Sequence, residues 1–212
     1  MEEKNLDSKL EESETIELEK VRLRRSWSFW ENYESLKKSG KEYSQLLKEI
    51  YTFDNIISFW QFWNKYPGSD IRKIFYDGEY VKYFFKEKYR IVAINIFVNG
   101  IKPEWEDKNN KEGNILTLEY VIDKDLNQFL SMANDLWIKL IIILIGETIP
   151  YSNNINGIRF VDKTKLNKSV IFKFEVWANK LMQEKELEKI KLDLSKSFGC
   201  KGTIKKIRKH EK

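Results

Sequence analysis

Hydrophobic residues recur along this chain with two different spacings. Apolar residues at alternate positions predict strands, whereas apolar residues three or four positions apart predict helices. Alternation predicts strands over residues 26–30, 91–98, 114–121, 158–162, 169–177 and 203–208. The longer spacing predicts helices over residues 55–65, 124–145 and 180–197. Because these elements interleave with hairpin-like spacing, the pattern favours an antiparallel α+β fold.

Local signals mark the ends of the predicted helices. Asp54 and Asp123 stand where an N-cap is expected for the first and second helix, and Pro67 follows the first. Gly146 and Gly199 stand where the second and third helix should end, because glycine adopts the left-handed conformation at little cost. A charged, aromatic-rich stretch at residues 69–89 predicts a loop or a short hairpin.

The second predicted helix is apolar around more of its circumference than one buried stripe requires. Ile138, Ile141 and Ile142 extend the apolar surface beyond the face formed by residues such as Leu140. Such a helix is either deeply buried or covered by a partner. The uninterrupted apolar run at residues 140–145 is too short to cross a bilayer, so no membrane association is expected.

Charge is distributed unevenly along the 212 residues. Residues 1–20 hold eight acids and three bases, a net charge of −5; the whole chain carries +5, so the remainder carries +10. We predict a disordered acidic tail at 1–20, a single domain over 21–208 with an insertion at about 67–90, and a basic tail at 209–212. A basic domain favours a polyanionic partner.

The chain has one cysteine, Cys200, and one histidine, His210. These counts exclude a disulfide framework, most zinc sites, and both Ser-His-Asp and Cys-His catalytic groups within one chain. The N-terminal residues do not resemble a signal peptide. We therefore expect a protein of the cytoplasm, also compatible with the nucleus, that is monomeric and not an enzyme, with no metal, cofactor or catalytic residue.

Residues 99–113 form the most informative loop. Gly100 and Pro103 stand near its start and Gly113 at its end, with Trp105 and Glu106 adjacent between them. An indole on a loop offers a flat π surface to a ligand, and the neighbouring carboxylate can accept hydrogen bonds from the ligand's edge. The alternative interpretation is a tryptophan that covers the end of a sheet beside a solvated acidic turn.

The segment Gly100-Ile101-Lys102-Pro103-Glu104-Trp105-Glu106-Asp107 resembles the eukaryotic translation initiation factor 4E family, proteins that bind the 5′ cap of messenger RNA. The resemblance covers roughly residues 20–207. Supporting matches, in the family's order, are Trp27-Ser28-Phe29-Trp30, Phe53-Asp54, Phe59-Trp60, Leu136-Trp137-Ile138 and Leu144-Ile145-Gly146-Glu147. The resemblance implies a curved antiparallel β-sheet with three helices packed on its convex face.

The resemblance also implies a site for 7-methylguanosine. The methylated base is cationic, so two aromatic rings can hold it by stacking and cation–π attraction, and one carboxylate can accept from its N1–H and N2–H groups. Trp105 takes one stacking position and Glu106 the carboxylate position. Tyr43 takes the second stacking position, where most members carry Trp and the 4E-homologous class, associated with translational repression, carries Tyr. The alternative for Tyr43 is a residue that anchors its loop.

The phosphates of the cap are assigned to a basic turn. Lys163 and Lys168 match the family's phosphate-binding positions, where arginine is frequent, so a weaker and more salt-sensitive grip is expected. The alternative is an ordinary solvated turn. Phe172 aligns with the family's tryptophan that touches the N7-methyl group and would keep that apolar contact.

The family binds partners through its other surface. A helix with a Tyr-x-x-x-x-Leu-apolar motif, from a 4G-type scaffold or a 4E-binding repressor, occupies an apolar groove there, and Ile56, Trp60, Ile138 and Ile142 match that groove. Lys139 stands where the family has an acid, so an acidic residue is expected on the partner. The expected function is therefore cap binding and partner recruitment in translation initiation or its control.

Two other functions are compatible with parts of the sequence. An adaptor would keep the partner-binding surface while its cap site is weakened or lost, as the lysines and Tyr43 allow. A hydrolase acting on capped RNA is disfavoured, since neither a metal-binding carboxylate cluster nor a nucleophile–base pair is evident.

Overall fold

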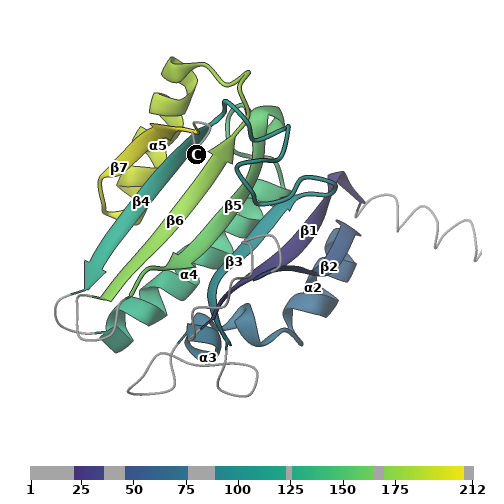
Figure 1. The fold of residues 1–212 in the computed structure, drawn as a ribbon, viewed down its shortest axis with the longest axis vertical. Coiled ribbons are helices and arrows are strands. Elements are labelled where there is room, and N and C mark those ends of the chain that lie inside the picture. Colours follow the sequence, from purple (N-terminus) through teal and green to yellow (C-terminus); the bar gives the residue numbers. More distant parts are fainter. Residues whose placement is uncertain (1–21, 36–45, 76–88, 123–125, 165–169, 208–212) are drawn as a thin grey trace, which may run out of the picture.

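The computed structural model describes residues 22–35, 46–75, 89–122, 126–164 and 170–207 (Figure 1). Within these residues the backbone forms one seven-stranded sheet with helices along one of its sides (Figure 1). The predicted acidic tail, the basic tail and most of the predicted insertion lie outside the described residues. The curved antiparallel α+β fold expected from the resemblance is confirmed.

Every paired strand of the sheet runs antiparallel to its neighbour. The order across the sheet is β2-β1-β3-β5-β6-β4-β7. The strands are β1 (Arg22–Ser35), β2 (Leu47–Asn55), β3 (Tyr89–Val98), β4 (Asn114–Ile122), β5 (Ile155–Asp162), β6 (Val170–Ala178) and β7 (Gly202–Lys206). Six of them match predicted strands. β2, which forms one edge, was not predicted.

The described residues contain four α-helices instead of the expected three. They are α2 (Ile56–Trp63), α3 (Ile71–Phe75), α4 (Leu126–Ile145) and α5 (Glu184–Phe198), and short 3-10 turns lie at Pro67–Ser69 (η2) and Ser152–Asn154 (η3). The additional helix, α3, falls where a loop or hairpin was predicted. Its buried residues Ile71, Ile74 and Phe75 face the core, and the Ile71 amide donates to Asn134 Oδ1 of α4 at 3.1 Å.

Two predicted boundaries need correction. The N-cap of α2 is Asn55, not Asp54, because the Asn55 side chain accepts from the Ser58 amide at 2.8 Å. The first strand does not end at Trp30 but continues to Ser35, since its pairing with β3 extends through Tyr33 and beyond. The end of α5 at Gly199, which adopts φ +64°, agrees with the prediction.

The long helix α4 lies along the sheet and contributes much of the hydrophobic core. Leu130, Ala133, Trp137 and Ile141 are each fully buried. By length and hydropathy alone, residues 128–145 could cross a membrane, but half of that window is buried inside the fold. The buried face is what a core helix requires.

The register divides the sheet into two faces. On the helix side, a continuous row of core residues crosses the strands: Phe29, Ile96, Ile158, Val176, Leu116 and Ile204. Their neighbours along each strand must point to the opposite side, because successive side chains of a strand alternate between faces. We call this opposite side the open face, because the helices of Figure 1 do not cover it.

Candidate functional site

The loop at residues 99–113, the recognition loop, leaves the sheet at the end of β3. The Asn99 amide donates to Ser26 O of β1 at 2.8 Å, and the Ile101 amide donates to Val98 O at 3.0 Å. Gly100 between them has φ +84°, a conformation that residues with a Cβ rarely adopt. The chain therefore turns sharply at Gly100, as the glycine predicted.

Two polar side chains hold the recognition loop together from within. Asp107 accepts from the Lys102 amide at 2.9 Å and from the Asn109 amide at 2.8 Å. Asn110, only 1% exposed, donates to Lys102 O at 2.7 Å and to Glu104 O at 2.8 Å. Backbone carbonyls removed from water need such partners, and Asn110 supplies them for Lys102 and Glu104.

Three further contacts attach the recognition loop to the sheet. Asn156 of β5 donates to Asn109 O at 2.8 Å and to Asn110 Oδ1 at 2.9 Å. The Ile207 amide, after β7, donates to Gly113 O at 2.8 Å. A Cβ on Gly113 would lie 2.1 Å from the Ala178 carbonyl oxygen, so this close approach requires glycine.

The loop presents Trp105 and Glu106 to solvent. The Trp105 side chain is 44% exposed, which leaves a substantial part of its ring accessible to a ligand, and Glu106 is exposed. Glu104 on the other side of Trp105 is half-buried, and burial raises the pKa of its carboxyl, with Glu106 and Asp107 adding to the rise and Lys102 opposing it. Trp105 therefore lies at the surface of the loop and is not buried under the end of the sheet.

An apolar cluster supports the recognition loop from the open face. Phe97 of β3 and Trp177 of β6 are fully buried, with ring centroids 5.6 Å apart in an edge-to-face arrangement. Ile101 of the loop packs against this cluster together with Ile115 and Ile207. Trp177 was not selected from the sequence. The signal was present, because Trp177 stands at an alternate position to the apolar residues of β6 and so points to the other face of the sheet.

Phe172 lies on the opposite side of the sheet from this cluster, and its contact with the methyl group of the cap stays a prediction. Its side chain is 3% exposed and stacks on Phe129 and Phe160, each 5.4 Å away between ring centroids, on the helix side of the sheet. The aromatic residue of β6 that lies on the open face is Trp177.

The remaining predicted cap residues are only partly placed. Lys163 is exposed just beyond the end of β5, with its amide bonded to Ile171 O at 2.8 Å. Because β5 runs antiparallel to β3, Lys163 lies at the opposite end of these strands from the start of the recognition loop. Tyr43 and Lys168 lie outside the described residues.

The residues predicted for partner binding lie on the helix side of the sheet. On α2, Trp60 is 38% exposed and Ile56 is half-buried; on α4, Ile142 is 47% exposed and Ile138 is half-buried. Lys139 is exposed. Figure 1 shows α2 and α4 on the same side of the sheet. Large apolar side chains are thus exposed on both helices, whereas Ile141, also part of the apolar surplus of α4, is buried in the core.

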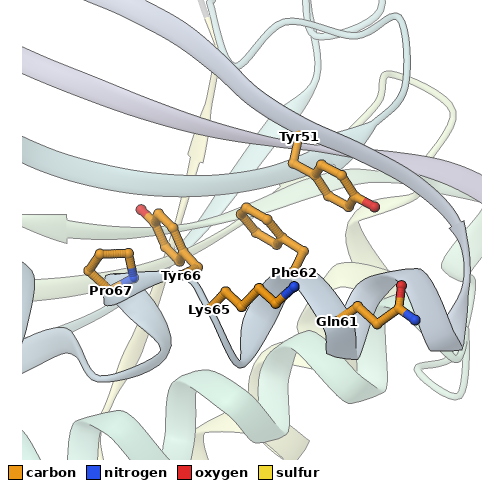
Figure 2. A pocket seen from close by; sticks show the side chains of 6 residues that line it. All are labelled: Tyr51, Gln61, Phe62, Lys65, Tyr66 and Pro67. Atoms are coloured by element: carbon orange, nitrogen blue, oxygen red, sulfur yellow. The ribbon is translucent and has the colours of Figure 1, made fainter.

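A separate hollow of about 420 Å³ lies beside β2 and α2 (Figure 2). The ring of Phe62 stacks between those of Tyr51 and Tyr66, with centroid distances of 4.6 and 5.1 Å. Lys65, Gln61 and Pro67 complete its lining. The Tyr66 hydroxyl donates to Glu31 at 2.6 Å, and burial raises the pKa of Tyr66. This hollow contains none of the predicted site residues.

Comparison with solved structures shows that the fold is similar to that of two eIF4E-3 proteins. The eIF4E-3 of Ascaris suum, in complex with the m7G cap, has a TM-score of 0.65 at 20% identity, over 91% of this chain and 94% of that chain. The eIF4E-3 of C. elegans, in complex with the 4E-binding protein Mextli, has a TM-score of 0.63 at 21% identity, over 84% and 87% of the two chains. These likenesses show the fold.

Sequence comparisons show the family. The eukaryotic translation initiation factor 4E of Candida albicans is 30% identical over 64% of this chain and 56% of its own length. The eukaryotic translation initiation factor 4E of Dictyostelium discoideum is 25% identical over 86% of this chain and 62% of its own length. The matches thus span about three fifths of these relatives. The family model for eukaryotic initiation factor 4E matches residues 22–211. The chain therefore belongs to the eukaryotic initiation factor 4E family.

Proposed function

We propose that this protein binds the 7-methylguanosine cap of messenger RNA on the open face of its sheet, and is not an enzyme. The observation that carries the proposal is the exposed Trp105–Glu106 pair on a loop held in one shape by Asp107, Asn110 and Asn156. A preformed loop avoids the cost of ordering its residues when a ligand binds. That a protein of similar fold, the eIF4E-3 of Ascaris suum, is solved in complex with the m7G cap supports cap binding as the function.

Each group of the cap has a proposed partner. Trp105 stacks on one side of the cationic base, and Glu106 accepts hydrogen bonds from its N1–H and N2–H groups. Tyr43 stacks on the other side, while Lys163 and Lys168 attract the phosphates. Stacking contributes about 1–3 kcal/mol per base and a hydrogen bond to a charged group roughly 1.5–3 kcal/mol. After the cost of association, these contributions are compatible with micromolar binding.

Fluorescence titration with 7-methyl-GTP and with GTP tests this function. The wild-type protein is expected to bind 7-methyl-GTP at least tenfold more tightly, because only the methylated base carries the positive charge that favours the aromatic rings. Glu106→Gln should weaken 7-methyl-GTP binding by about tenfold or more, since the amide offers one acceptor and no charge. Glu112→Gln, an exposed acid on the same loop, is the control. Equal affinities for the two nucleotides would contradict the proposal.

We further propose that the helix side of the sheet binds a helix of a partner protein. That partner is a 4G-type scaffold or a 4E-binding repressor. The exposed Trp60 and Ile142 favour this role. C. elegans eIF4E-3 in complex with the 4E-binding protein Mextli supports it. A protein that uses only this surface would be an adaptor, and it would bind such a helix without binding the cap.

The charge of Lys139 gives this second surface a specific test. An amphipathic helical peptide with an acid facing Lys139 should bind the wild type several-fold more tightly than Lys139→Glu, because the substitution places like charges together. Isothermal titration calorimetry measures both affinities. Lys189→Glu, which makes the same charge change on α5, should bind like the wild type. Unchanged binding by Lys139→Glu would reject the pairing.

A further inference from the structure

A row of polar side chains crosses the open face, directly beside the cluster that supports the recognition loop. The register aligns Trp30, Asn95, Arg159, Glu175 and Thr117 across β1, β3, β5, β6 and β4, and we call these residues the central row. Phe97, Gly157, Trp177 and Ile115 form the next row toward the recognition loop. The helix-side rows of the same strands are apolar, so the central row is a distinct feature.

The central row contains a nearly buried ion pair. Arg159 Nη1 lies 3.3 Å from Glu175 Oε2, and the two side chains are only 11% and 13% exposed. Arg159 Nε also donates to Asn95 Oδ1 at 2.8 Å, and Asn95 Nδ2 donates to Asn32 Oδ1 at 2.7 Å. Arg159, Glu175 and Asn95 therefore each have a defined partner, which a charged pair removed from water requires.

Glu175 links this ion pair to the aromatic cluster. Trp177 Nε1 donates to Glu175 Oε2 at 3.1 Å, the same oxygen that faces Arg159. The Arg159 guanidinium lies over the Trp177 ring, 5.3 Å from its centroid. Trp177 is thus held by a hydrogen bond at its edge and by a cation on its face, in addition to its contact with Phe97.

Trp177 in turn lies beneath the loop that carries the binding residues. Ile101 packs against the cluster that Trp177 forms with Phe97 and Ile207, and the amide of Ile207 donates to Gly113 O. A Cβ on Gly157 would lie 2.4 Å from the Phe97 ring, so the cluster has little room to rearrange. Movement of the Trp177 indole would therefore displace both ends of the recognition loop.

We propose that Arg159 and Glu175 are positioning residues for the cap site, which orient Trp177 so that the recognition loop presents Trp105 and Glu106 correctly. The proposal rests on the proposed cap-binding function. It assigns no ligand contact to Arg159 or Glu175. They act through Trp177 and Ile101.

Glu175→Gln tests the proposal with little change in shape. The substitution removes the negative charge that Arg159 Nη1 and Trp177 Nε1 share at Oε2. It also introduces amide N–H groups, which would face other donors. Hydrogen exchange without nucleotide should show the amides of Asn110, Gly113 and Ile207 exchanging about tenfold faster, while the amides of the β1–β2 ladder are unchanged. Affinity for 7-methyl-GTP should fall by about tenfold.

The matched control is Glu119→Gln, which breaks the neighbouring β4–β6 ion pair with Lys173 on the same face. It should change neither the exchange of the loop amides nor nucleotide affinity. The double variant Arg159→Gln/Glu175→Gln replaces the ion pair by two amides that can pair with each other, and it should recover part of both losses. If Glu175→Gln does not fold, the double variant provides the test instead. The recognition-loop amides of the double variant should exchange faster than those of the wild type.

The outcomes separate this proposal from the proposed function. Loop exchange and affinity within twofold of wild type in folded Glu175→Gln would overturn the positioning role, as would equally accelerated exchange throughout the sheet. If the wild type does not prefer 7-methyl-GTP to GTP, the cap-binding function fails. The exchange comparison still decides whether the ion pair positions the loop.

Discussion

Replacing Trp105 with alanine is expected to weaken 7-methyl-GTP binding by about thirtyfold, or roughly 2 kcal/mol, because one side of the cationic base loses its stacking partner. The ring is exposed and its loop is held by side chains other than its own, so the loop should keep its shape. Affinity is measured by fluorescence titration of the remaining tryptophans, or by calorimetry if their signal is too small.

Two variants make this result specific. Trp105→Phe keeps a smaller π surface and should recover part of the lost affinity. Trp60→Ala removes a tryptophan of similar exposure, 38% against 44%, from the helix side of the sheet and should leave 7-methyl-GTP binding unchanged. A Trp105→Ala protein that binds the nucleotide as tightly as wild type would show that this ring is not a stacking partner.

The largest loss of stability is expected from Arg25→Met. Arg25 Nε lies 2.6 Å from Glu147 Oε1, and the Glu147 side chain is only 2% exposed. The arginine also donates to Ser152 O at 2.9 Å and to Ile155 O at 3.0 Å. Removing one partner leaves a buried carboxylate without its counter-charge, which costs about 3–5 kcal/mol. That is a large part of the roughly 5–15 kcal/mol that stabilises a typical domain.

Urea unfolding followed by circular dichroism measures this loss of stability. Arg22→Met supplies the control, because it removes the same charge from the same strand. The side chains of the Arg22–Asp54 pair are 69% and 50% exposed and its atoms lie 3.7 Å apart, so little change is expected. Equal stability of the two variants would show that the Arg25 contacts do not hold the start of β1 to the segment after α4.

Periodicity predicted the elements with the most regular patterns. Strands β3, β4 and β6 and helix α4 contain long runs in which one face is consistently apolar, and the structure confirms them. β2 was missed because it lies at the sheet edge, where Lys48, Glu49 and Thr52 are exposed and the pattern is weak. α3 is five residues long, too short for a helical period to be distinguished from a charged loop.

The candidate site was predicted unevenly for similar reasons. Trp105 and Glu106 lie in a segment whose glycines and proline indicate a loop, and the structure places them on one. Phe172 was assigned because it aligns with the family's tryptophan, and the structure places it on the helix side of the sheet. Strand alternation gives Phe172, Phe174 and Val176 one face and Trp177 the other, so the signal was present in the sequence.

The central row could not be predicted from a single sequence. Arg159 and Glu175 lie on different strands, and only the register shows that they are opposite each other. Register depends on the pairing of all the neighbouring strands, which local residue patterns do not determine. The same limit applies to Asn156, whose hydrogen bonds to Asn109 and Asn110 connect segments more than forty residues apart.

The hydrogen bond from the Ile207 amide to Gly113 O has a consequence for synthesis on the ribosome. β7 pairs with β4, whose residues are made about ninety positions earlier. A nascent chain can form the β1–β2 and β1–β3 pairings early, but the hydrogen bond to Gly113 O cannot form until Ile207 leaves the exit tunnel. Nucleotide-binding competence is therefore expected only after β7 and Ile207 have been made, when the other strands of the sheet have already been able to pair.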